Sequence, residues 1–372
     1  MLQVEDRKVV KFIRNWNLCF PPIFVKPVTP VEQYDVIIVG GGPAGLQCAG
    51  ILSRSDLRVL LLEKNEQFGD KLCAGGLTIR DLELLPLPDH VIQQSVSHAV
   101  IRSRRRSAST ITPVPYLFTV DRKELGAYQR GLLDGTSVTV MTRSQVTEID
   151  SDRITLRNGQ TYGYRTLVGA DGYASVVRRH LGLSVRRRLI GFQYTIPLAA
   201  VDPVVEIYLE ARRFHVWYAW IFPHRDTVAV GCCCDPDVVD HIRVKEQFHD
   251  WLREKGIGTG DAKLESHPMS YDYRGVRFGN IFLAGEAAGL TSGLTGEGIY
   301  QSLASGQEVA HMIMDPDYSP ELLGRVLKYN RMLERIKRSF LLAGPFRGFM
   351  QELFVCSLNL KPVRMRVKDT FS

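Results

Sequence analysis

Residues 34–64 read YDVIIVGGGPAGLQCAGILSRSDLRVLLLEK, and this stretch decides the fold. Its first apolar, β-branched run, Asp35–Val39, is of the kind that forms a buried strand. A helix is expected from about Ala44 to Ser53, followed by a second buried strand over Arg58–Leu62. A strand, a helix and a strand in this order predict the start of an α/β domain with a parallel sheet.

The turn between the first strand and the helix carries the pattern G-x-G-x-x-G, with Gly40, Gly42 and Gly45 as its glycines. Gly40 permits the tight turn, Gly42 lets the backbone approach a diphosphate, and Gly45 lets the helix and the strand pack closely. The amides of the first helical turn, together with the helix dipole, would then hold the negative charge. The turn therefore predicts a dinucleotide-binding site.

An acid follows the second strand where such a site needs one. Glu63 lies 23 residues after Gly40, at a strand end where a carboxylate accepts hydrogen bonds from ribose hydroxyls. Because an acid disfavours a 2′-phosphate, FAD or NAD fits this segment better than NADP. The candidate cofactor contacts here are Gly40, Gly42, Pro43, Ala44, Gly45, Glu63 and Lys64.

Two later segments favour FAD over NAD. Residues 166–183 read TLVGADGYASVVRRHLGL, an apolar strand that leads into Asp171-Gly172. Residues 280–302 read NIFLAGEAAGLTSGLTGEGIYQS, a strand that ends in Gly285-Glu286 before a Gly-rich turn and a helix. Both are strand–turn–helix units far from the first one, and a domain that binds only a nicotinamide dinucleotide has no use for them.

With these three segments in this order, the sequence resembles the para-hydroxybenzoate hydroxylase-like FAD superfamily. The resemblance implies that Asp171-Gly172 lies near the diphosphate, that Glu286 holds the ribityl chain, and that the turn 293–298 passes near the flavin. Glu286 stands where the family has an aspartate, so the carboxylate is kept but is one methylene longer. Arg122 matches an arginine that precedes a helix in the family, although an exposed position at a helix start is the alternative. The further implied cofactor contacts are Arg122, Asp171, Gly172, Gly285, Glu286, Gly296, Gly298 and Ile299.

Two more segments narrow the resemblance to the geranylgeranyl reductase family. Residues 71–78 read KLCAGGLT and residues 217–231 read WYAWIFPHRDTVAVG, which look like the family's Cys-Gly-Gly turn and Y-x-W-x-F-P segment. Ala74 is an insertion in the first of them. The resemblance implies saturation of isoprenoid C=C bonds by a hydride from reduced FAD and a proton, with NAD(P)H or ferredoxin as electron donor. An isoprenoid or prenyl lipid is the implied substrate.

The same resemblance suggests roles for four side chains. Cys73 is the candidate proton donor, because a thiol near neutral pKa gives up and regains a proton; a small pocket-lining residue is the alternative. Tyr218, Trp220 and Phe222 alternate along an expected strand and so share one face. That face is expected to form the wall of an apolar substrate cavity, or else to pack between a sheet and the cofactor domain.

The expected fold is α/β: a Rossmann-like, hydroxylase-type FAD-binding domain with an inserted, mostly β substrate domain and a C-terminal helical segment. Residues 1–33 read as an N-terminal extension. The cofactor domain is expected to be discontinuous, and the stretch 186–274 shows the alternation of half-buried strands. The expected pieces are 34–85, 111–185 and 275–315 for the cofactor domain, 86–110 and 186–274 for the substrate domain, and 316–372 for a basic helical region.

Positive charge gathers in the last part of the chain. The formal net charge is +7, and residues 322–372 carry 11 Lys and Arg against 3 Asp and Glu, a net of +8. A solvated basic helix face is one interpretation and contact with anionic lipid headgroups is another. Nucleic acid is not expected as a partner, since no recognised motif accompanies the charge. Apolar residues at helical spacing between 341 and 354, with an interruption at Gly344-Pro345, are expected to pack into the core by default.

The cysteines argue against a metal site and a disulfide framework. Their number is seven, their spacing is irregular and no CxxC pair occurs, which fits a reducing, cytoplasmic setting. Cys232, Cys233 and Cys234 are adjacent on an expected strand, so they point to alternate faces and are expected to pack in the core or a pocket. Neither a secretory signal nor a run of the ~18 apolar residues of a membrane span is seen.

Three classes of function remain open. The leading hypothesis is an FAD-dependent prenyl reductase, peripheral to the membrane if the basic region meets lipid. The alternative is a monooxygenase or halogenase of the same fold, which would use reduced flavin and O2 on an apolar substrate. A flavin-bearing lipid-binding or regulatory protein is the third.

Overall fold

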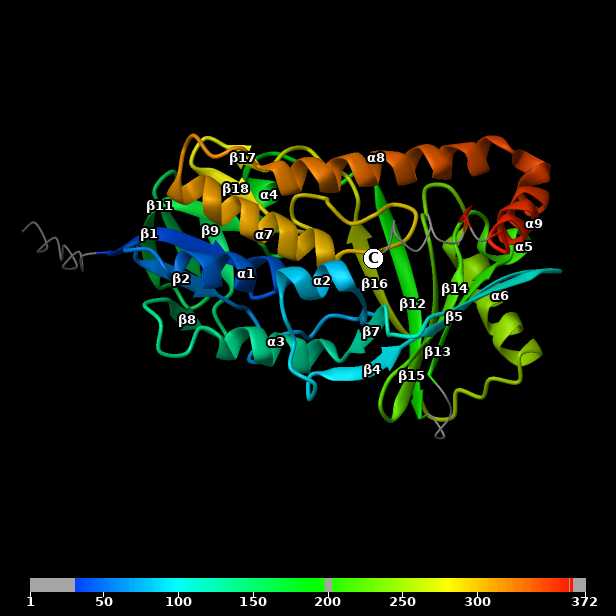
Figure 1. The fold of residues 1–372 in the computed structure, drawn as a ribbon. Helices are drawn as coiled ribbons and strands as arrows, with labels where there is room; N and C mark the ends of the chain where they lie inside the picture. Colours follow the sequence, from blue (N-terminus) through cyan, green and yellow to red (C-terminus); the bar gives the residue numbers. More distant parts are fainter. Residues whose placement is uncertain (1–30, 198–202, 361, 364–372) are drawn as a thin grey trace, which may run out of the picture. The chain divides into compact units, whose positions relative to one another are not determined.

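The structure, a computed structural model, describes residues 31–197, 203–360, 362 and 363. The described residues from 33 onward form one compact unit. The predicted N-terminal extension lies almost entirely outside the described residues. Within the described part of the compact unit the strands form three sheets, of eight, seven and three strands (Figure 1).

The eight-stranded sheet is built around three parallel pairings, β1 with β2, β2 with β8, and β11 with β18. Its order is β17-β18-β11-β1-β2-β8, and β10 and β9 continue from β11. The strands are β1 (Glu32–Val39), β2 (Val59–Leu62), β8 (Thr139–Met141), β9 (Val146–Ile149), β10 (Arg153–Leu156), β11 (Thr161–Gly169), β17 (Arg277–Phe278) and β18 (Ile281–Leu283).

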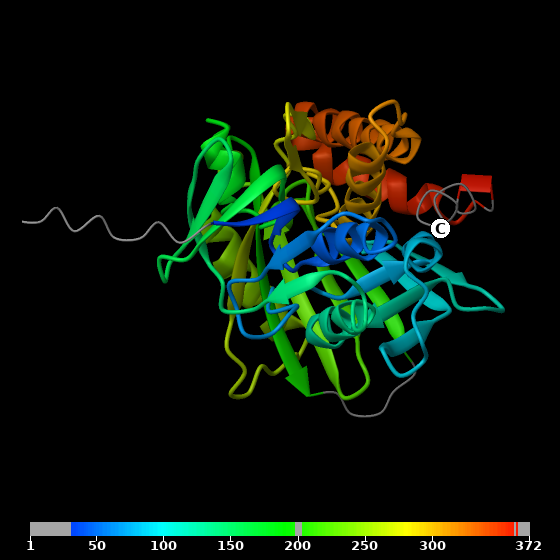
Figure 2. The same ribbon diagram turned by 90° about the vertical axis from the view of Figure 1, so that its left-hand side faces the viewer.

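Helices cover this sheet, which explains why β1 and β2 are almost continuous apolar runs. Ile37, Ile38, Leu60 and Leu61 are completely buried. Helix α1 (Pro43–Leu52) packs on β2, on α3 (Arg122–Gly131) and along α7 (Ile299–Met314) (Figure 2). Helix α4 (Val176–His180) packs on β9 and β11. The predicted first strand, helix and second strand are confirmed with bounds shifted by one to three residues.

The seven-stranded sheet has the order β16-β12-β15-β14-β13-β5-β6. Its core is aromatic: Phe214, Trp217, Phe248 and Trp251 are fully buried. Helices α5 (Ala211–Phe214) and α6 (His241–Glu254) pack on β15. The strands are β5 (His98–Ser103), β6 (Ser107–Ile111), β12 (Arg188–Pro197), β13 (Val204–Leu209), β14 (Ala219–Pro223), β15 (Thr227–Cys234) and β16 (Glu265–Ser270).

The small third sheet joins β3 (Gly76–Thr78), β7 (Leu117–Val120) and β4 (Ile92–Val96), and helix α2 (Ile79–Leu84) follows β3. Strands β4 and β5 are neighbours in sequence, within one predicted piece of the substrate domain, yet they belong to different sheets. The predicted domain boundaries stay a prediction.

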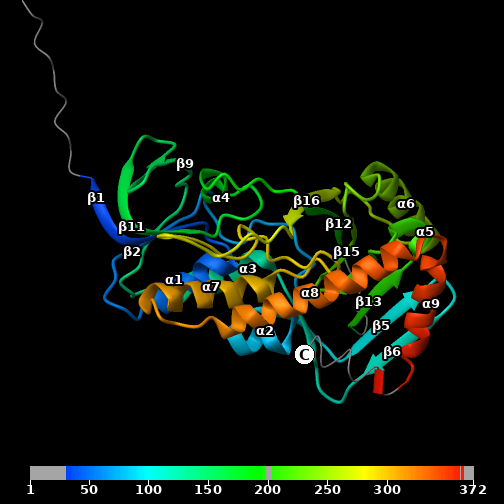
Figure 3. The ribbon, with the colours of Figure 1, turned by 90° about the horizontal axis from the view of Figure 1, so that it is seen from above.

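The C-terminal segment is helical, as predicted, and is interrupted at Gly344-Pro345. Helix α8 (Glu321–Leu342) starts against α7, the short helix η1 (Gly344–Phe346) turns the chain, and α9 (Arg347–Ser357) packs on β5, β6 and α5 (Figure 3). The expected core packing of the apolar residues is wrong for four of them. Leu342, Phe346, Phe349 and Leu353 are 88%, 72%, 61% and 53% exposed, because the apolar side of this turn faces no other element of the described chain.

Candidate active site

The three predicted cofactor segments meet at the carboxyl ends of parallel strands, where open α/β sheets bind their ligands. The amide of Ala170 donates to Val39 O at 2.8 Å, and the amide of Ala284 donates to Gly169 O at 2.9 Å. Strand β1 therefore ends beside β11, and β11 beside β18. A Cβ added to Gly172 would lie 3.5 Å from Glu286 Oε2, so the Asp-Gly and Gly-Glu segments are in contact.

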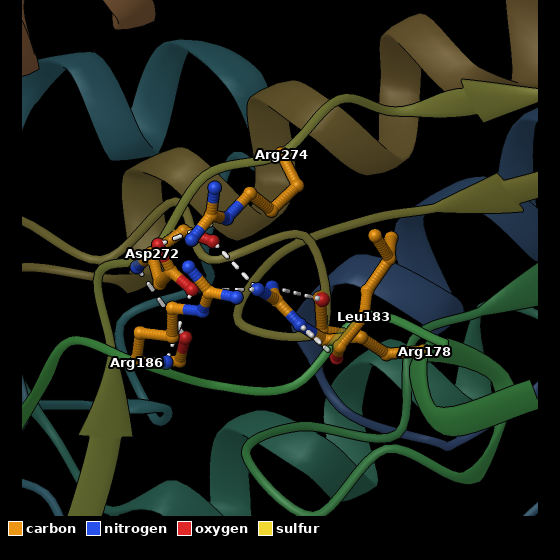
Figure 4. Close-up of polar contacts among 7 residues, drawn as sticks. Arg178, Leu183, Arg186, Asp272 and Arg274 are labelled. Carbon is orange, nitrogen blue, oxygen red and sulfur yellow. Dashed lines mark hydrogen bonds and ion pairs between the residues drawn. The ribbon is translucent and has the colours of Figure 1, made fainter. Parts of the chain in front are cut away.

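A buried ion pair fixes the second segment to the third. The guanidinium of Arg178 donates from Nη2 to Asp272 O at 2.8 Å and to Asp272 Oδ2 at 3.2 Å, and from Nη1 to Ala287 O at 3.1 Å. Figure 4 shows Arg178 pointing at Asp272, with Arg274 on the other side of the same carboxylate. Both partners of the pair are almost fully buried. Arg178 thus holds the loop before Glu286 against the helix after Asp171.

The glycines of the first turn have surroundings that suit the roles predicted for them. Gly40 has φ +107°, and a Cβ there would lie 2.4 Å from Ala170 O; a Cβ on Gly45 would lie 2.0 Å from Gly40 O. By contrast, a Cβ on Gly42 would meet nothing nearer than Ala170 O at 4.0 Å. The space over Gly42 is open to the cavity, at a helix start that carries no side-chain cap. Such a start offers backbone N–H groups to an anion.

Glu63 is buried and held by its own backbone neighbours. Its Oε2 accepts from the amide of Gly41 at 2.8 Å, and its Oε1 accepts from the amide of Asn65 at 2.9 Å. These bonds orient the carboxylate at the cavity wall and stabilise the turn that precedes α1. The predicted ribose contact of Glu63 stays a prediction, as does that of Lys64, which is exposed and lines the same cavity.

Two charged side chains in this region have polar atoms with no protein partner. Arg122, the first residue of α3, is buried, so the alternative of an exposed helix start is wrong. Among the described residues, its Nη1 has no hydrogen-bond partner, nor does Oδ1 of Asp171. Burial lowers the pKa of Arg122 and raises the pKa of Asp171. Buried polar atoms without partners, next to a helix start that is open to an anion, fit a cofactor that has a diphosphate and hydroxyl groups. FAD is such a cofactor.

Glu286 is engaged by a residue to which the sequence assigned no role. Lys71 Nζ donates to Glu286 Oε2 at 2.6 Å, and the amide of Ser270 donates to Oε1 at 3.1 Å. Lys71 belongs to the quoted stretch KLCAGGLT, but nothing in its spacing points to a residue 215 positions away. The carboxylate that the resemblance assigns to the ribityl chain is therefore already oriented by the protein.

One cavity of about 1150 Å³ joins these residues to the Cys73 turn. The Cys73 carbonyl accepts from Gln193 Nε2 at 3.2 Å, and its Sγ accepts from the amide of Gly75 at 3.3 Å. The inserted Ala74 is accommodated because its carbonyl lies 3.1 Å from His224 Nε2. Gln193 and His224, both buried, give no signal in the sequence that could have linked them to this turn.

Tyr218, Trp220 and Phe222 line the same cavity. Trp220 Nε1 donates to Gln193 Oε1 at 3.3 Å, so the aromatic strand and the Cys73 turn share one buried amide. The hydroxyl of Tyr218 donates to Thr295 O, next to Gly296 and Gly298. The predicted cavity face and the predicted flavin turn therefore meet, together with Ile299, in one wall.

Cys232, Cys233 and Cys234 are all buried on β15. Cys233 lines the cavity, while its two neighbours do not. The three thiols thus alternate along the strand as predicted, in core or pocket positions.

Comparison with known proteins agrees with this geometry. The model of the Thi4 family matches residues 24–93. A geranylgeranyl diphosphate reductase of Rhodobacter capsulatus is 27% identical over 300 residues, which cover 76% of this chain and 75% of the relative. A digeranylgeranylglycerophospholipid reductase of Methanocaldococcus jannaschii is 26% identical over 344 residues, 82% of this chain and 88% of the relative.

The chain is an FAD-dependent oxidoreductase that is similar in sequence to geranylgeranyl reductases. Solved structures give the same fold. A geranylgeranyl bacteriochlorophyll reductase-like protein from Thermoplasma acidophilum superimposes with a TM-score of 0.75 at 20% identity, covering 89% of this chain and 92% of that one. The p-nitrophenol 4-monooxygenase of Pseudomonas putida gives a TM-score of 0.70 at 18% identity, covering 92% and 98%. The predicted fold class of this reductase-like chain is confirmed.

Proposed function

We propose that the protein is an FAD-dependent prenyl reductase that saturates isoprenoid C=C bonds. One observation carries the proposal: the cavity that reaches the open fingerprint turn is also lined by apolar side chains of β14, α8 and α9. Its volume of about 1150 Å³ exceeds the roughly 300–1,000 Å³ of ordinary small-molecule sites. Space for a dinucleotide and a long apolar chain in one cavity suits a prenyl substrate.

Different residues have different proposed roles in such a reaction. Bound reduced FAD supplies a hydride. The open turn at Gly42, with Arg122 and Asp171, holds the cofactor, and Tyr218, Trp220 and Phe222 hold the apolar chain and exclude water. A proton must also reach the alkene, and Cys73 is the proposed donor, since its thiol lies in a turn that lines the cavity.

The substrate class follows from the names of the relatives combined with the apolar cavity. One relative is named for geranylgeranyl diphosphate and another for a digeranylgeranyl glycerophospholipid. An isoprenoid diphosphate or a prenyl lipid is therefore proposed for this chain. NAD(P)H or ferredoxin is proposed as the electron donor that reduces the flavin.

The alternative is a monooxygenase or halogenase. Its support is the likeness of fold to p-nitrophenol 4-monooxygenase and to a flavin-dependent brominase, which superimposes with a TM-score of 0.67. The apolar cavity suits such a substrate too. The two proposals differ in whether the substrate gains two hydrogen atoms or an atom derived from O2 or halide.

Contact with an anionic membrane surface is proposed for the C-terminal apolar patch, defined as Leu342, Phe346, Phe349 and Leu353. The hairpin between β5 and β6 lies beside it and carries three exposed arginines, Arg104, Arg105 and Arg106. It is tied to α9 because Ser103 Oγ donates to Glu352 at 2.7 Å.

Exposed apolar side chains rimmed by cations are typical of interfacial binding, and α8 and α9 also line the substrate cavity. No helix in the described part of the chain is long and apolar enough to cross a bilayer.

Flotation with vesicles that contain anionic lipid tests the patch. The wild-type chain is expected to float, and a Phe346→Ser, Phe349→Ser variant to remain in the soluble fraction. Ile242→Ser is the matched control, because Ile242 is 60% exposed on α6. Flotation of the double variant at the wild-type level would contradict membrane contact through the C-terminal apolar patch.

Two experiments test the reductase itself. Mass spectrometry of lipids extracted from the purified protein is expected to find polyprenyl chains, and Cys73→Ser is expected to lower turnover about 10²–10⁴-fold, the usual contribution of a positioned proton donor. Cys356→Ser serves as the control, because Cys356 does not line the cavity. Full turnover in Cys73→Ser would remove its role as proton donor while leaving the flavin assignment intact.

A further inference from the structure

Glu297 is connected to two cavities, to one directly and to the other through its hydrogen-bond partner Tyr329. It lines the main cavity, within the turn that resemblance places near the flavin. A second pocket of about 680 Å³ is lined by Tyr300 and by Arg80 and Tyr329, the two residues that approach Glu297. Their helices α2, α7 and α8 are labelled in Figure 3. The sequence predicts a role for the glycines of this turn but none for Glu297, which lies between them.

The two carboxylate oxygens of Glu297 have different surroundings. Its Oε2 accepts from the hydroxyl of Tyr329 at 3.2 Å. Its Oε1 is buried without a hydrogen-bond partner in the part of the chain that the structure describes, and Arg80 Nη2 is 4.0 Å away. One turn along the chain, the completely buried amide of Gln301 also has both polar atoms unpartnered. Buried polar atoms of this kind indicate a functional role or an ordered water rather than a structural bond.

The charged groups around Glu297 come from each element packed against it. On α2, Asp81 and Arg80 face it; on α8, Tyr329 does; and Tyr218 approaches it across the main cavity. The Arg80 guanidinium lies over the ring of Tyr300 at 4.8 Å and over that of Tyr329 at 5.2 Å. Tyr300 in turn is close to Arg325.

These surroundings favour the protonated form of the Glu297 carboxyl. Burial raises the pKa of Glu297, while Arg80, Tyr329 and Gln301 lower it less. Burial, and then the neighbouring Glu297, raise the pKa of Asp81 to about 7. Two acids that influence each other titrate as a pair, and both pKa values are raised, so the pair keeps its protons to a higher pH than ordinary carboxyls do.

We propose that Glu297 is a proton-relay residue that restores the proton of the cavity's donor after each saturation, drawing it through Tyr329 from water in the second pocket. This proposal rests on the prenyl reductase function. Every C=C bond that is saturated takes up one hydride and one proton, and an apolar cavity that excludes water cannot replace the proton by itself.

The transfer balances at each site. The Glu297 O–H bond breaks as an S–H bond re-forms on the Cys73 thiolate. A new O–H bond forms on Glu297 as the Tyr329 hydroxyl gives up its proton, and Tyr329 takes one from water in the second pocket. The hydroxide that is left there takes a proton from the buffer. The relay moves no electrons, and the hydride comes from the reduced FAD that the proposed function already requires.

The kinetic test compares first and later turnovers. In Glu297→Gln the first turnover of pre-reduced, FAD-loaded enzyme is expected at the wild-type rate, because the relay acts only after the donor has given up its first proton. Steady-state turnover is expected to fall about 10²–10⁴-fold with KM unchanged. Tyr329→Phe is expected to show the same split with a smaller loss, and Glu297→Asp to recover part of the rate. Glu246→Gln, an exposed acid on α6, is the control.

A spectroscopic readout needs no substrate. Infrared difference spectra of the FAD-loaded protein between acidic and alkaline pH are expected to show a carboxylic acid band that titrates well above the ordinary range of glutamate and is absent in Glu297→Gln. Absence of that band in the wild-type chain, or a Glu297→Gln variant with wild-type steady-state turnover, overturns the relay. Failure of the wild-type chain to saturate any prenyl bond, with the band present, overturns the proposed function instead.

Discussion

Lys71 donates a hydrogen bond to Glu286 at 2.6 Å and so joins the Cys73 turn to the third cofactor segment, 215 residues away in sequence. The Glu286 side chain is 7% exposed, and the amide of Ser270 supplies its other contact. The pair fixes the direction of a carboxylate at the carboxyl ends of the parallel strands, where open α/β sheets bind their ligands.

Glu286→Ala is expected to weaken FAD binding about tenfold or more, since a hydrogen bond to a charged group contributes roughly 1.5–3 kcal/mol. Titration of the flavin-free protein with FAD, followed by flavin fluorescence, measures the change. Glu265→Ala, an exposed acid on β16, should leave the affinity unchanged. Equal affinity in both variants would contradict the assignment of Glu286 to the cofactor.

Arg122→Met is expected to change stability and FAD affinity in opposite directions. Without FAD the variant should be more stable by about 1–3 kcal/mol, because it removes a buried cation whose Nη1 has no partner. FAD affinity should fall by a similar free energy. Urea unfolding of the flavin-free protein measures the change in stability, and FAD titration measures the change in affinity. Lys123→Met, at an exposed position, is the control. A loss of stability without FAD would mean that Arg122 is a structural residue.

Asp272→Asn is expected to destabilise the fold by about 3–5 kcal/mol, since it leaves the buried Arg178 without its counter-charge. Asp250→Asn removes one partner of an exposed pair on α6 and should cost about 0–1 kcal/mol. Chemical denaturation of both variants tests the contrast. Similar losses in the two would show that the Arg178 pair does not hold the segments together.

Stability is expected to fall as the pH rises from about 4 to about 7. The pKa of Asp81 is raised from 3.8 to about 7, so in that window the folded state binds more protons than the unfolded state, and protons stabilise it. Asp81→Asn should reduce this loss in the free energy of unfolding by on the order of 4 kcal/mol at most, because each pKa unit corresponds to about 1.36 kcal/mol. Urea unfolding across this range measures it, with exposed Asp134→Asn as control. An unchanged slope in Asp81→Asn would contradict the raised pKa.

The sequence predicted the parts of the site that depend on local pattern. Gly40 and Gly45 are required by close backbone approaches, and those approaches follow from a short turn between a strand and a helix. The strands could be placed because β1 and β2 are continuous apolar runs. Alternation then placed Tyr218, Trp220 and Phe222 together.

What the sequence could not predict depends on contacts across the fold. Lys71 meets Glu286, and Gln193 joins Cys73 to Trp220, only because loops from different sheets come together. The exposed Leu342 and Phe346 follow the same spacing as a buried stripe, since periodicity indicates a shared face but not what covers it. The sequence gives no signal for Glu297, between two glycines, because its environment comes from α2 and α8.

The most direct test of the central claim is a single turnover in the strict absence of O2. FAD-loaded protein is reduced chemically, mixed with geranylgeranyl diphosphate, and the product is analysed by mass spectrometry while the flavin absorbance is followed. The prenyl reductase is expected to reoxidise the flavin and to yield a product that has gained two hydrogen atoms. A flavin that stays reduced until O2 is admitted, with a product that then carries an oxygen atom, would contradict it.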